Sequence, residues 1–281
     1  MNRIISIAEN LASAISMSEF WALRFVRLLF RMAISLPRRI TVLSGIFVTL
    51  LGSIPTMASE VVVAVAANFV TTARVLVEDF QADGKHRVIL VHGSTGKIYA
   101  QIVSGAPFDV FLAADRLRPE LLDHAGLAAK RTAYAFGKLT FLAGEGGQGN
   151  VATLETRYPR IAVADPETAP YGVAAKEVLV ALRGEENWAR NVVFGDSVGQ
   201  AFNFVASGNV NAGFVAKSQI AAHPFDGSDY VVPEHLYSPI RQEAVLLDQA
   251  ISNPAAINFY TYLSSPRARV IIRASGYGLP D

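Results

Sequence analysis

Short β-rich runs alternate with amphipathic helical segments along residues 61–275, and this alternation limits the possible folds more than any other feature. Val61–Ala66 is typical of a buried strand, and Thr71–Gln81 places Leu76 and Phe80 on one face of a helix. Repeated strand–helix alternation predicts parallel α/β layers. The Gly-rich stretch Gly144–Asn150 is expected to be a turn within this pattern, and not a linker between independent domains.

The same patterns predict the remaining elements. Strands are expected at Arg87–Val91, Pro107–Ala113, Leu139–Ala143, Ile161–Ala164, Asn191–Phe194, Ala212–Val215 and Gln242–Leu246. Helices are expected from Gly96 to Val103 and at Arg118–Ala125, Gly172–Arg183, Gln200–Ser207, Lys217–Ala222, Ala255–Leu263 and Pro266–Ser275.

The first 58 residues are typical of an export signal. Arg38 and Arg39 precede an apolar run that ends near Leu51, and small residues follow up to Ala58, after which we predict cleavage. The residues before Met32 fit no export signal, so we predict that translation starts at Met32. A membrane anchor is the alternative, but the run is short for a span of about 20 residues. A twin-arginine signal is a further and less favoured alternative, because the residues after the arginine pair match such a signal poorly.

Composition narrows the class of protein. The 281 residues include no cysteine, which excludes disulfides, thiolate metal sites, a cysteine nucleophile and a lipoprotein anchor. Residues 1–58 hold six of the 25 basic side chains and two of the 24 acidic ones, so residues 59–281 carry a net charge of −3. A mildly acidic body does not indicate a nucleic-acid partner. An export signal without a lipid-accepting cysteine leaves the mature protein free to diffuse, and a second membrane is needed to retain it. We therefore predict a protein of a Gram-negative periplasm.

Four strand-to-helix turns carry the chemistry of the sequence. Each places small or hydroxyl residues where a helix begins, and free N–H groups with the positive end of the helix dipole favour anions there. The alternative for each turn alone is helix capping, since Asn, Ser and Thr are ordinary N-cap residues. In an open α/β sheet, ligands bind beyond the carboxyl ends of the strands. The four turns are Ala66–Phe69, Gly93–Gly96, Pro166–Gly172 and Asp196–Gly199.

Other chemistry is poorly supported by the sequence. The five histidines have no metal-ligand spacing, and there is no G-x-S-x-G nucleophile motif. Gly93–Lys97 lacks the spacing of a phosphate-binding P-loop. Asp109 and Asp115 flank a β-rich run and are interpreted as structural residues, not as an acid–base pair. We therefore expect a binding protein without enzymatic activity, resident metal or cofactor, although spacing alone leaves open a catalytic group assembled in space.

One segment of the chain is more specific than any single turn: Gly105–Asp115, which has the sequence GAPFDVFLAAD. It is accompanied by the AANF, GSTG and SVGQA turns, by ADP…APYG, by GFVA at 213–216 and by the ending GYGLP. On these segments, residues 61–280 resemble the periplasmic molybdate-binding proteins of ABC importers. The resemblance covers essentially all of the chain after the export signal.

This resemblance implies a two-lobed, venus-flytrap α/β fold in which each lobe is a mostly parallel sheet flanked by helices. Lobe one is expected at residues 60–136 plus 237–281 and lobe two at 137–236. The ligand, molybdate or tungstate, is expected in the cleft, and the implied partner is the permease of an ABC transporter at the inner membrane. We expect a monomer. The implied ligand positions are Ala67, Asn68, Ser94, Thr95, Tyr171 and Val198.

The chain departs from the family pattern at two of these regions. Many members have Ala-Ser where this chain has Ala67-Asn68, and many have a ligand tyrosine at the position of Ala216, so Tyr171 is expected to supply the phenol instead. These departures concern selectivity, so a site for sulfate or phosphate is the main alternative. An effector domain of a regulator can share the architecture, but the export signal and the lack of a helix-turn-helix argue against it.

Overall fold

The structure is a computed structural model that describes residues 59–144, 158–223, 225 and 227–281. These residues belong to one compact unit, Ala58–Asp281. The predicted export signal, with its cleavage after Ala58 and the start at Met32, lies outside the described residues, as does most of the expected turn after Gly144. Within the described part, no helix combines the length and the apolarity needed to cross a bilayer.

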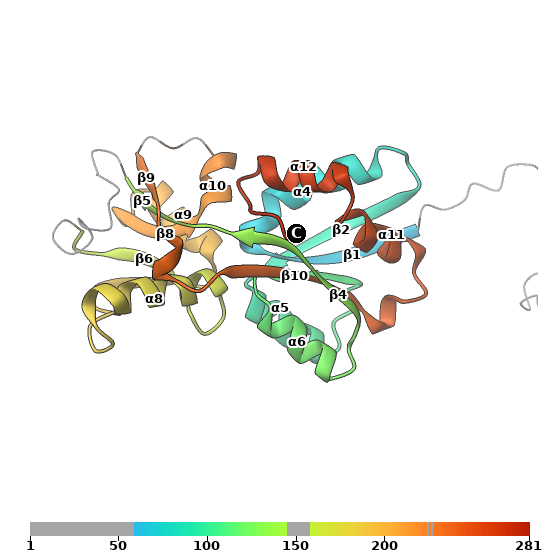
Figure 1. Ribbon diagram of the computed structural model, residues 1–281, viewed down its shortest axis with the longest axis horizontal. Coiled ribbons are helices and arrows are strands. Elements are labelled where there is room, and N and C mark those ends of the chain that lie inside the picture. Colours follow the sequence, from blue (N-terminus) through green and yellow to red (C-terminus); the bar gives the residue numbers. More distant parts are fainter. Residues whose placement is uncertain (1–58, 145–157, 224, 226) are drawn as a thin grey trace, which may run out of the picture. The chain divides into compact units, whose positions relative to one another are not determined.

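Two five-stranded sheets organise the unit (Figure 1). We call the half around each sheet a lobe. The sheet of lobe one has the order β2 (His86–Gly93), β1 (Ser59–Ala66), β3 (Val110–Leu112), β10 (Ile240–Leu247) and β4 (Ala128–Gly137). The sheet of lobe two has the order β7 (Val192–Gly195), β6 (Ile161–Ala164), β8 (Ala212–Ala216), β5 (Leu139–Ala143) and β9 (Ser228–Val231).

Each sheet has four strands in one direction and one strand that opposes them. In lobe one β1 pairs in parallel with β2 and β3, and β10 runs antiparallel between β3 and β4. In lobe two β6 pairs in parallel with β7 and β8, and β5 runs antiparallel between β8 and β9. The predicted two-lobed α/β fold with mostly parallel sheets is thus confirmed.

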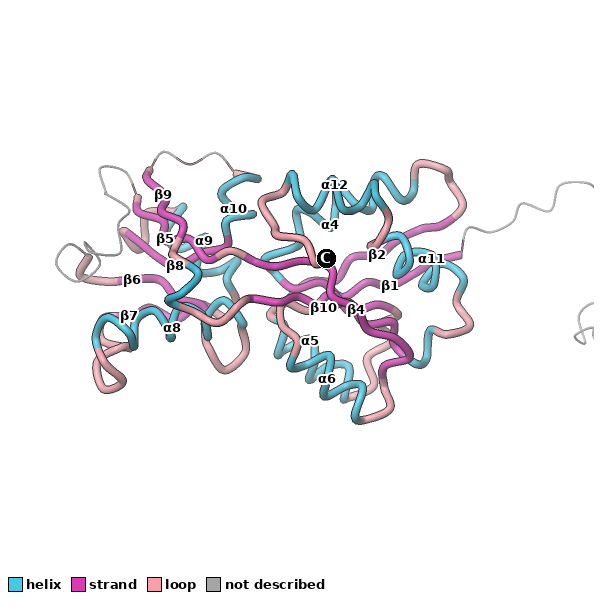
Figure 2. The backbone as a smooth tube through the Cα atoms, viewed as in Figure 1, coloured by secondary structure: helices cyan, strands magenta, loops and turns pink. Residues whose placement is uncertain are grey.

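Alternation along β1 explains how lobe one is covered on both faces. Val61, Val63 and Val65 point to a core shared with helices α4 (Val70–Gln81), α11 (Pro254–Tyr262) and α12 (Pro266–Ala274). Ala64 points to the opposite core, under α5 (Thr95–Val103) and α6 (Leu117–His124). The tube drawing shows the two groups of helices on opposite faces of the sheet (Figure 2). A strand buried on both faces must be apolar throughout, as Val61–Ala66 is.

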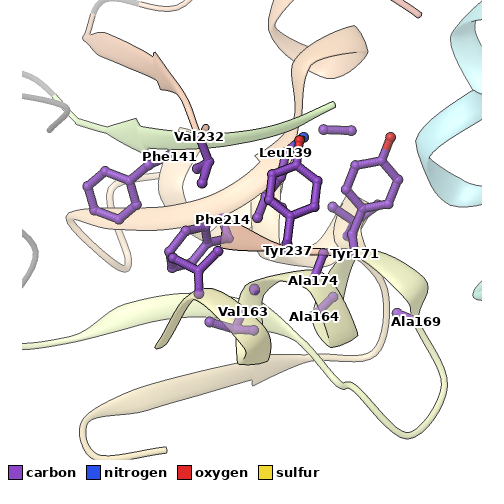
Figure 3. Close-up of a cluster of buried hydrophobic side chains, with 14 of the residues drawn as sticks. Leu139, Phe141, Val163, Ala164, Ala169, Tyr171, Ala174, Phe214, Val232 and Tyr237 are labelled. Carbon is purple, nitrogen blue, oxygen red and sulfur yellow. The ribbon is translucent and has the colours of Figure 1, made fainter. Parts of the chain in front are cut away.

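Lobe two repeats this plan with α8 (Pro170–Arg183) on one face and α9 (Val198–Ala206) on the other. The core under α8 contains edge-to-face contacts of Phe141 with Phe214 at 5.3 Å and with Tyr158 at 5.5 Å between ring centroids. Tyr171 and Tyr237 lie at the same end of this core, each with its hydroxyl pointing away from it (Figure 3). The short helix α10 (Lys217–Ala222) follows β8.

Three of the strands differ from the sequence-based expectation. β4 and β9 were not predicted, and the expected strand Pro107–Ala113 is confined to Val110–Leu112. Each missed strand has one neighbouring strand, β10 and β5 respectively, and β4 has in addition an isolated bridge between Phe136 and Gly278. An edge strand needs no apolar run, and β4 is rich in alanine and charged residues, which have low β-propensity. Its pairing with β10, and not its local sequence, makes it a strand.

The chain passes between the lobes twice, from β4 to β5 and from β9 to β10. Gly137 ends β4 at the first passage. A Cβ atom there would overlap the Tyr171 hydroxyl and lie 2.8 Å from Gln242 Nε2. Only glycine therefore allows the backbone to pass this close to side chains of both lobes.

Candidate ligand-binding site

A small cavity lies where the two lobes meet. Its wall is formed by residues that follow the carboxyl ends of β1, β2, β3, β6 and β7. Ligands of α/β proteins bind at this edge of the sheet. All four of the turns singled out in the sequence contribute to its wall. The lining residues are Ala66, Ala67, Asn68, Ser94, Thr95, Ala114, Ala169, Pro170, Tyr171, Ser197 and Val198.

Lobe one presents two hydroxyl groups at the start of α5. Ser94 caps the helix, and its Oγ accepts a hydrogen bond from Lys97 N at 3.4 Å. Thr95 Oγ1 accepts from Ala114 N at 3.2 Å. Both residues are buried, and within the described residues neither hydroxyl proton has an acceptor. Because a hydroxyl accepts and donates at once, both protons remain available to an anion in the cavity.

Lobe two presents the first turns of two helices. Pro170 is the first residue of α8, where its missing N–H costs no hydrogen bond, and Tyr171 follows it. Ser197 caps α9 by accepting from Gln200 N at 3.3 Å, and Val198 is the first residue of that helix. The positive ends of the two helix dipoles therefore meet at this wall of the cavity.

Asn68 is placed in the cavity wall, but its amide has a different set of partners from the one expected. Its Nδ2 donates to Gln242 Oε1 at 3.0 Å and to the Tyr277 hydroxyl at 3.1 Å. Its Oδ1 is buried and has no hydrogen-bond partner in the described part of the chain. Both amide protons are thus engaged in a buried polar network, and not directed at a ligand.

Three buried tyrosines border this network, and all keep their phenol protons. Burial is the main reason that the pKa values of Tyr171 and Tyr134 lie well above the ordinary value of 10, with the neighbouring phenols as a smaller cause. Burial likewise raises the pKa of Tyr277, against its hydrogen bonds with Ser218 and Asn68, which lower it. At neutral pH the surroundings of the cavity therefore hold phenols as donors and no phenolates.

Several hydrogen bonds and one ion pair join the two lobes around the cavity. Gly96 N donates to Thr168 O at 2.8 Å, beside the turn that carries the Ser94 and Thr95 hydroxyls. On the far side, Ser218 Oγ donates to Asn68 O at 3.1 Å. Lys97 Nζ lies 2.8 Å from Asp196 Oδ2, but both side chains are at least half exposed, so this ion pair adds little. The lobes are thus in contact on both sides of the cavity.

Arg118 is a further link between the lobes. Its Nη1 pairs with Asp115 Oδ2 at 2.6 Å within lobe one, and its Nη2 donates to Glu167 O of lobe two at 3.0 Å. Burial raises the pKa of Asp115, and the hydrogen bonds and charge of Arg118 oppose that rise. Asp115 also accepts from Arg118 N at 3.0 Å, so it starts α6 and orients the bridging guanidinium. This is the structural role expected for Asp115.

The structure brings all six sequence-predicted site residues into one cavity wall. Sequence reasoning missed the layer behind it. Gln242 appeared only as the start of a strand, and Tyr277 only as part of the terminal motif, although both bond to Asn68. No signal in the sequence marks Gln242, because its partners lie 174, 108 and 71 residues away along the chain.

Histidines take no part in the cavity wall. His92 and His223 line an adjacent groove, which shares Ala67, Asn68 and Ser197 with the cavity. The described residues include no group of three or more His, Asp or Glu side chains placed to hold a metal ion.

Comparison with known proteins agrees with this geometry. Over 230 residues the chain is 44% identical to the molybdate-binding protein ModA of Azotobacter vinelandii, covering 79% of this chain and 91% of the relative. It is 40% identical over 229 residues to ModA of Rhodobacter capsulatus, covering 80% and 90%. The solved structure of the Azotobacter vinelandii periplasmic molybdate-binding protein superposes with a TM-score of 0.73 at 38% identity, covering 79% of this chain and all of that one.

Residues 61–278 match the family described as bacterial extracellular solute-binding protein. The match covers most of the chain, and it confirms the expectation of a binding protein and not an enzyme. The chain belongs to the bacterial extracellular solute-binding proteins.

Proposed function

We propose that the chain captures molybdate in the cavity between its lobes and delivers it to an ABC importer. The observation that carries this proposal is the composition of the wall, in which the N-termini of α5, α8 and α9, the short turn Ala67–Phe69 and two hydroxyl protons converge and no described lining residue is charged. Partial positive charges from helix ends and N–H groups can hold a dianion without a cationic side chain. The names of the two relatives support the choice of anion.

Neutral donors suit a protein that must release its cargo. A buried ion pair between the anion and a Lys or Arg would be costly to break once water is excluded. Hydrogen bonds to hydroxyls and backbone N–H groups hold the anion only while both lobes surround it. Opening the lobes would therefore return the anion to water without leaving an unpaired cation buried.

We assign the ligand contacts to Ala67, Asn68, Ser94, Thr95, Tyr171 and Val198. The first four come from lobe one and the last two from lobe two, so binding and lobe closure are one event. A ring of donors fixed by two lobes cannot contract around a smaller ion, which favours molybdate and tungstate over sulfate and phosphate.

We further propose that the mature chain begins after Ala58, diffuses in the periplasm without a lipid anchor and acts as a monomer. Its lobes would be residues 60–136 plus 237–281 and residues 137–236. The transporter partner would be the permease in the inner membrane. N-terminal sequencing of the protein recovered from the periplasm tests the first part. A protein that retains the residues before Ala58 would contradict the cleavage proposal.

Titration calorimetry with molybdate, tungstate, sulfate and phosphate tests the choice of ligand. We expect saturable binding of molybdate and tungstate and at least about a hundredfold weaker binding of sulfate, a difference of roughly 2.8 kcal/mol. Sulfate or phosphate binding as tight as molybdate would overturn the assignment of the anion. The absence of binding for all four would overturn the proposed function.

A further inference from the structure

Gln242 connects the cavity wall of lobe one with that of lobe two. It lies on β10 with 0% of its surface exposed. Its Oε1 accepts from Asn68 Nδ2 at 3.0 Å and from the Tyr134 hydroxyl at 2.9 Å. Its Nε2 donates to the Tyr171 hydroxyl at 3.4 Å. A buried amide with partners on both cavity walls is in a position to control the groups that meet the anion.

The orientation of the Asn68 amide is unsuited to an anion. Its two protons go to Gln242 and Tyr277, and its buried Oδ1 has no partner in the described residues. A buried acceptor without a donor is costly, and an oxygen beside an anion is repelled. Half a turn about the terminal torsion would exchange the nitrogen and the oxygen, which are nearly equal in size. The protons would then point away from Gln242.

Asn68 cannot make this turn alone. Its Oδ1 would then face Gln242 Oε1, which is now 3.0 Å from the amide nitrogen, and two acceptors would meet. Gln242 must turn with it, so that Nε2 donates to Asn68 Oδ1 and to the Tyr134 hydroxyl. Tyr134 keeps an acceptor for its own proton, because Ala113 O lies 3.2 Å from its hydroxyl. Gln242 Oε1 would then accept the single proton of Tyr171, whose buried phenol stays protonated, and Tyr171 would meet the anion through its backbone N–H in the first turn of α8.

We infer that Gln242 is a positioning residue for the anion, because the Asn68 amide can present its protons to the anion only when the Asn68 and Gln242 amides turn together. This inference rests on the proposed function. In the turned arrangement the Tyr277 hydroxyl, now 3.1 Å from Asn68 Nδ2, donates its proton to Asn68 Oδ1, while Ser218 Oγ still donates to Asn68 O. Every member of the network then has a partner, and the Asn68 amide protons are released to the anion. The proton of Tyr171 then ties lobe two to β10, so the same rearrangement that offers a donor also holds the lobes together.

A double-mutant cycle tests this inference with molybdate as the probe. Gln242→Met keeps the approximate shape of the side chain but removes its polar atoms. We expect it to weaken molybdate binding about five- to tenfold in the otherwise unchanged protein. In an Asn68→Ala background the same change should have no further effect, because Gln242 acts through the Asn68 amide. Equal losses in both backgrounds would overturn the inference and indicate a merely structural role.

Gln242→Glu supplies a rescue measurement in case the methionine variant folds poorly. A carboxylate can only accept, so it would hold the Asn68 protons and weaken binding at about pH 8. Burial raises the pKa of such a carboxyl group, and its protonated form can again donate and accept. Affinity should therefore recover as the pH falls to about 5.5, relative to the unsubstituted protein at each pH. Affinity that stays low, or that never fell, would contradict the proposal.

Two controls separate the possible failures. Gln249→Met removes a glutamine whose Nε2 donates to Ala106 O and Phe108 O outside the cavity, and its molybdate affinity should be unchanged. The unsubstituted protein must bind molybdate for the cycle to be informative about Gln242. If it binds no molybdate, the proposed function fails. If it binds molybdate and the cycle is additive, only the role of Gln242 fails.

Discussion

At the scale of single residues, Asn68 tests the position of the anion, because its side chain lies in the cavity wall and caps no helix. Asn68→Asp preserves shape but places a carboxylate beside a dianion in a site without charged side chains, so binding should fall at least about a hundredfold. Asn68→Ala should cost about ten- to a hundredfold by removing a donor to a charged acceptor. Titration calorimetry paired with thermal melts measures both. An aspartate variant that binds molybdate like the unsubstituted protein would place the anion elsewhere.

The pH dependence of binding follows from the same neutral wall. Burial raises the pKa of Tyr171 well above 10, so its phenol keeps its proton, and no histidine lines the cavity. Molybdate affinity should therefore be nearly constant between about pH 6 and 9, where an unperturbed histidine would titrate. Calorimetry across this range checks it, with His92→Ala as the control for the nearest histidine at the neighbouring groove. A loss of affinity in that variant, with a matching pH profile, would refute a wall of neutral donors.

The cavity wall could be predicted from the sequence because its residues follow strands directly. Ser94 and Thr95 come after β2, and Val198 comes close after β7. Local chain order therefore already places each of them at the carboxyl edge of the sheet of its own lobe. Gln242 and Tyr277 could not be predicted, since their contacts with Asn68 depend on how segments far apart in the sequence pack against one another. The orientation of the Asn68 amide is set by those distant partners.

At the scale of elements, the start of α5 should control how well the lobes close. A Cβ at Gly96 would lie 3.0 Å from Thr168 Cα and 3.0 Å from Thr168 O, across the lobe junction. Gly96→Ala should therefore stretch the Gly96–Thr168 hydrogen bond and lower molybdate affinity about tenfold. The helix itself gains stability, because alanine in a helix is more favourable than glycine by about 0.5–1 kcal/mol. The melting temperature of the ligand-free protein should therefore not fall.

Gly199→Ala is the matched control for this prediction. Gly199 also lies in the first turn of a helix at the junction, but a Cβ there would lie at an ordinary 3.5 Å from Ala67 Cβ and Ser197 Oγ. Its affinity should stay within about twofold of the unsubstituted protein, or roughly 0.4 kcal/mol. Equal losses in the two variants would show that the approach of Gly96 to Thr168 is not what holds the lobes.

At the scale of the whole molecule, an anion shared by two lobes should draw them together. Small-angle scattering should give a smaller radius of gyration with molybdate than without it, because only the closed arrangement supplies donors from both sides. The absence of native cysteine allows spin labels at exactly two introduced sites, Lys97→Cys and Asp196→Cys, on opposite lobes. Their separation should shorten and become more uniform with molybdate. A distribution that molybdate leaves unchanged would count against a site between the lobes.

The fold class could be predicted from the sequence because strand–helix alternation persists along the chain. The strand orders could not, since β10 enters the sheet of lobe one between β3 and β4 from the far end of the sequence. That placement depends on pairing between segments that are far apart in the sequence, and a local sequence pattern does not reveal such pairing. β4 was missed for the same reason, because it is a strand only beside β10.

The central position of β10 also bears on how the protein is made. Lobe two is built from one uninterrupted stretch of chain, so it can acquire its native pairings as soon as β9 has emerged. The sheet of lobe one cannot be completed at that stage, because β10, residues 240–247, is the strand that joins β3 to β4. Long-range pairing of this kind is slow, and its unpaired edges invite aggregation meanwhile. For the export proposed above, this topology would delay completion of lobe one until nearly all of the chain has been translocated.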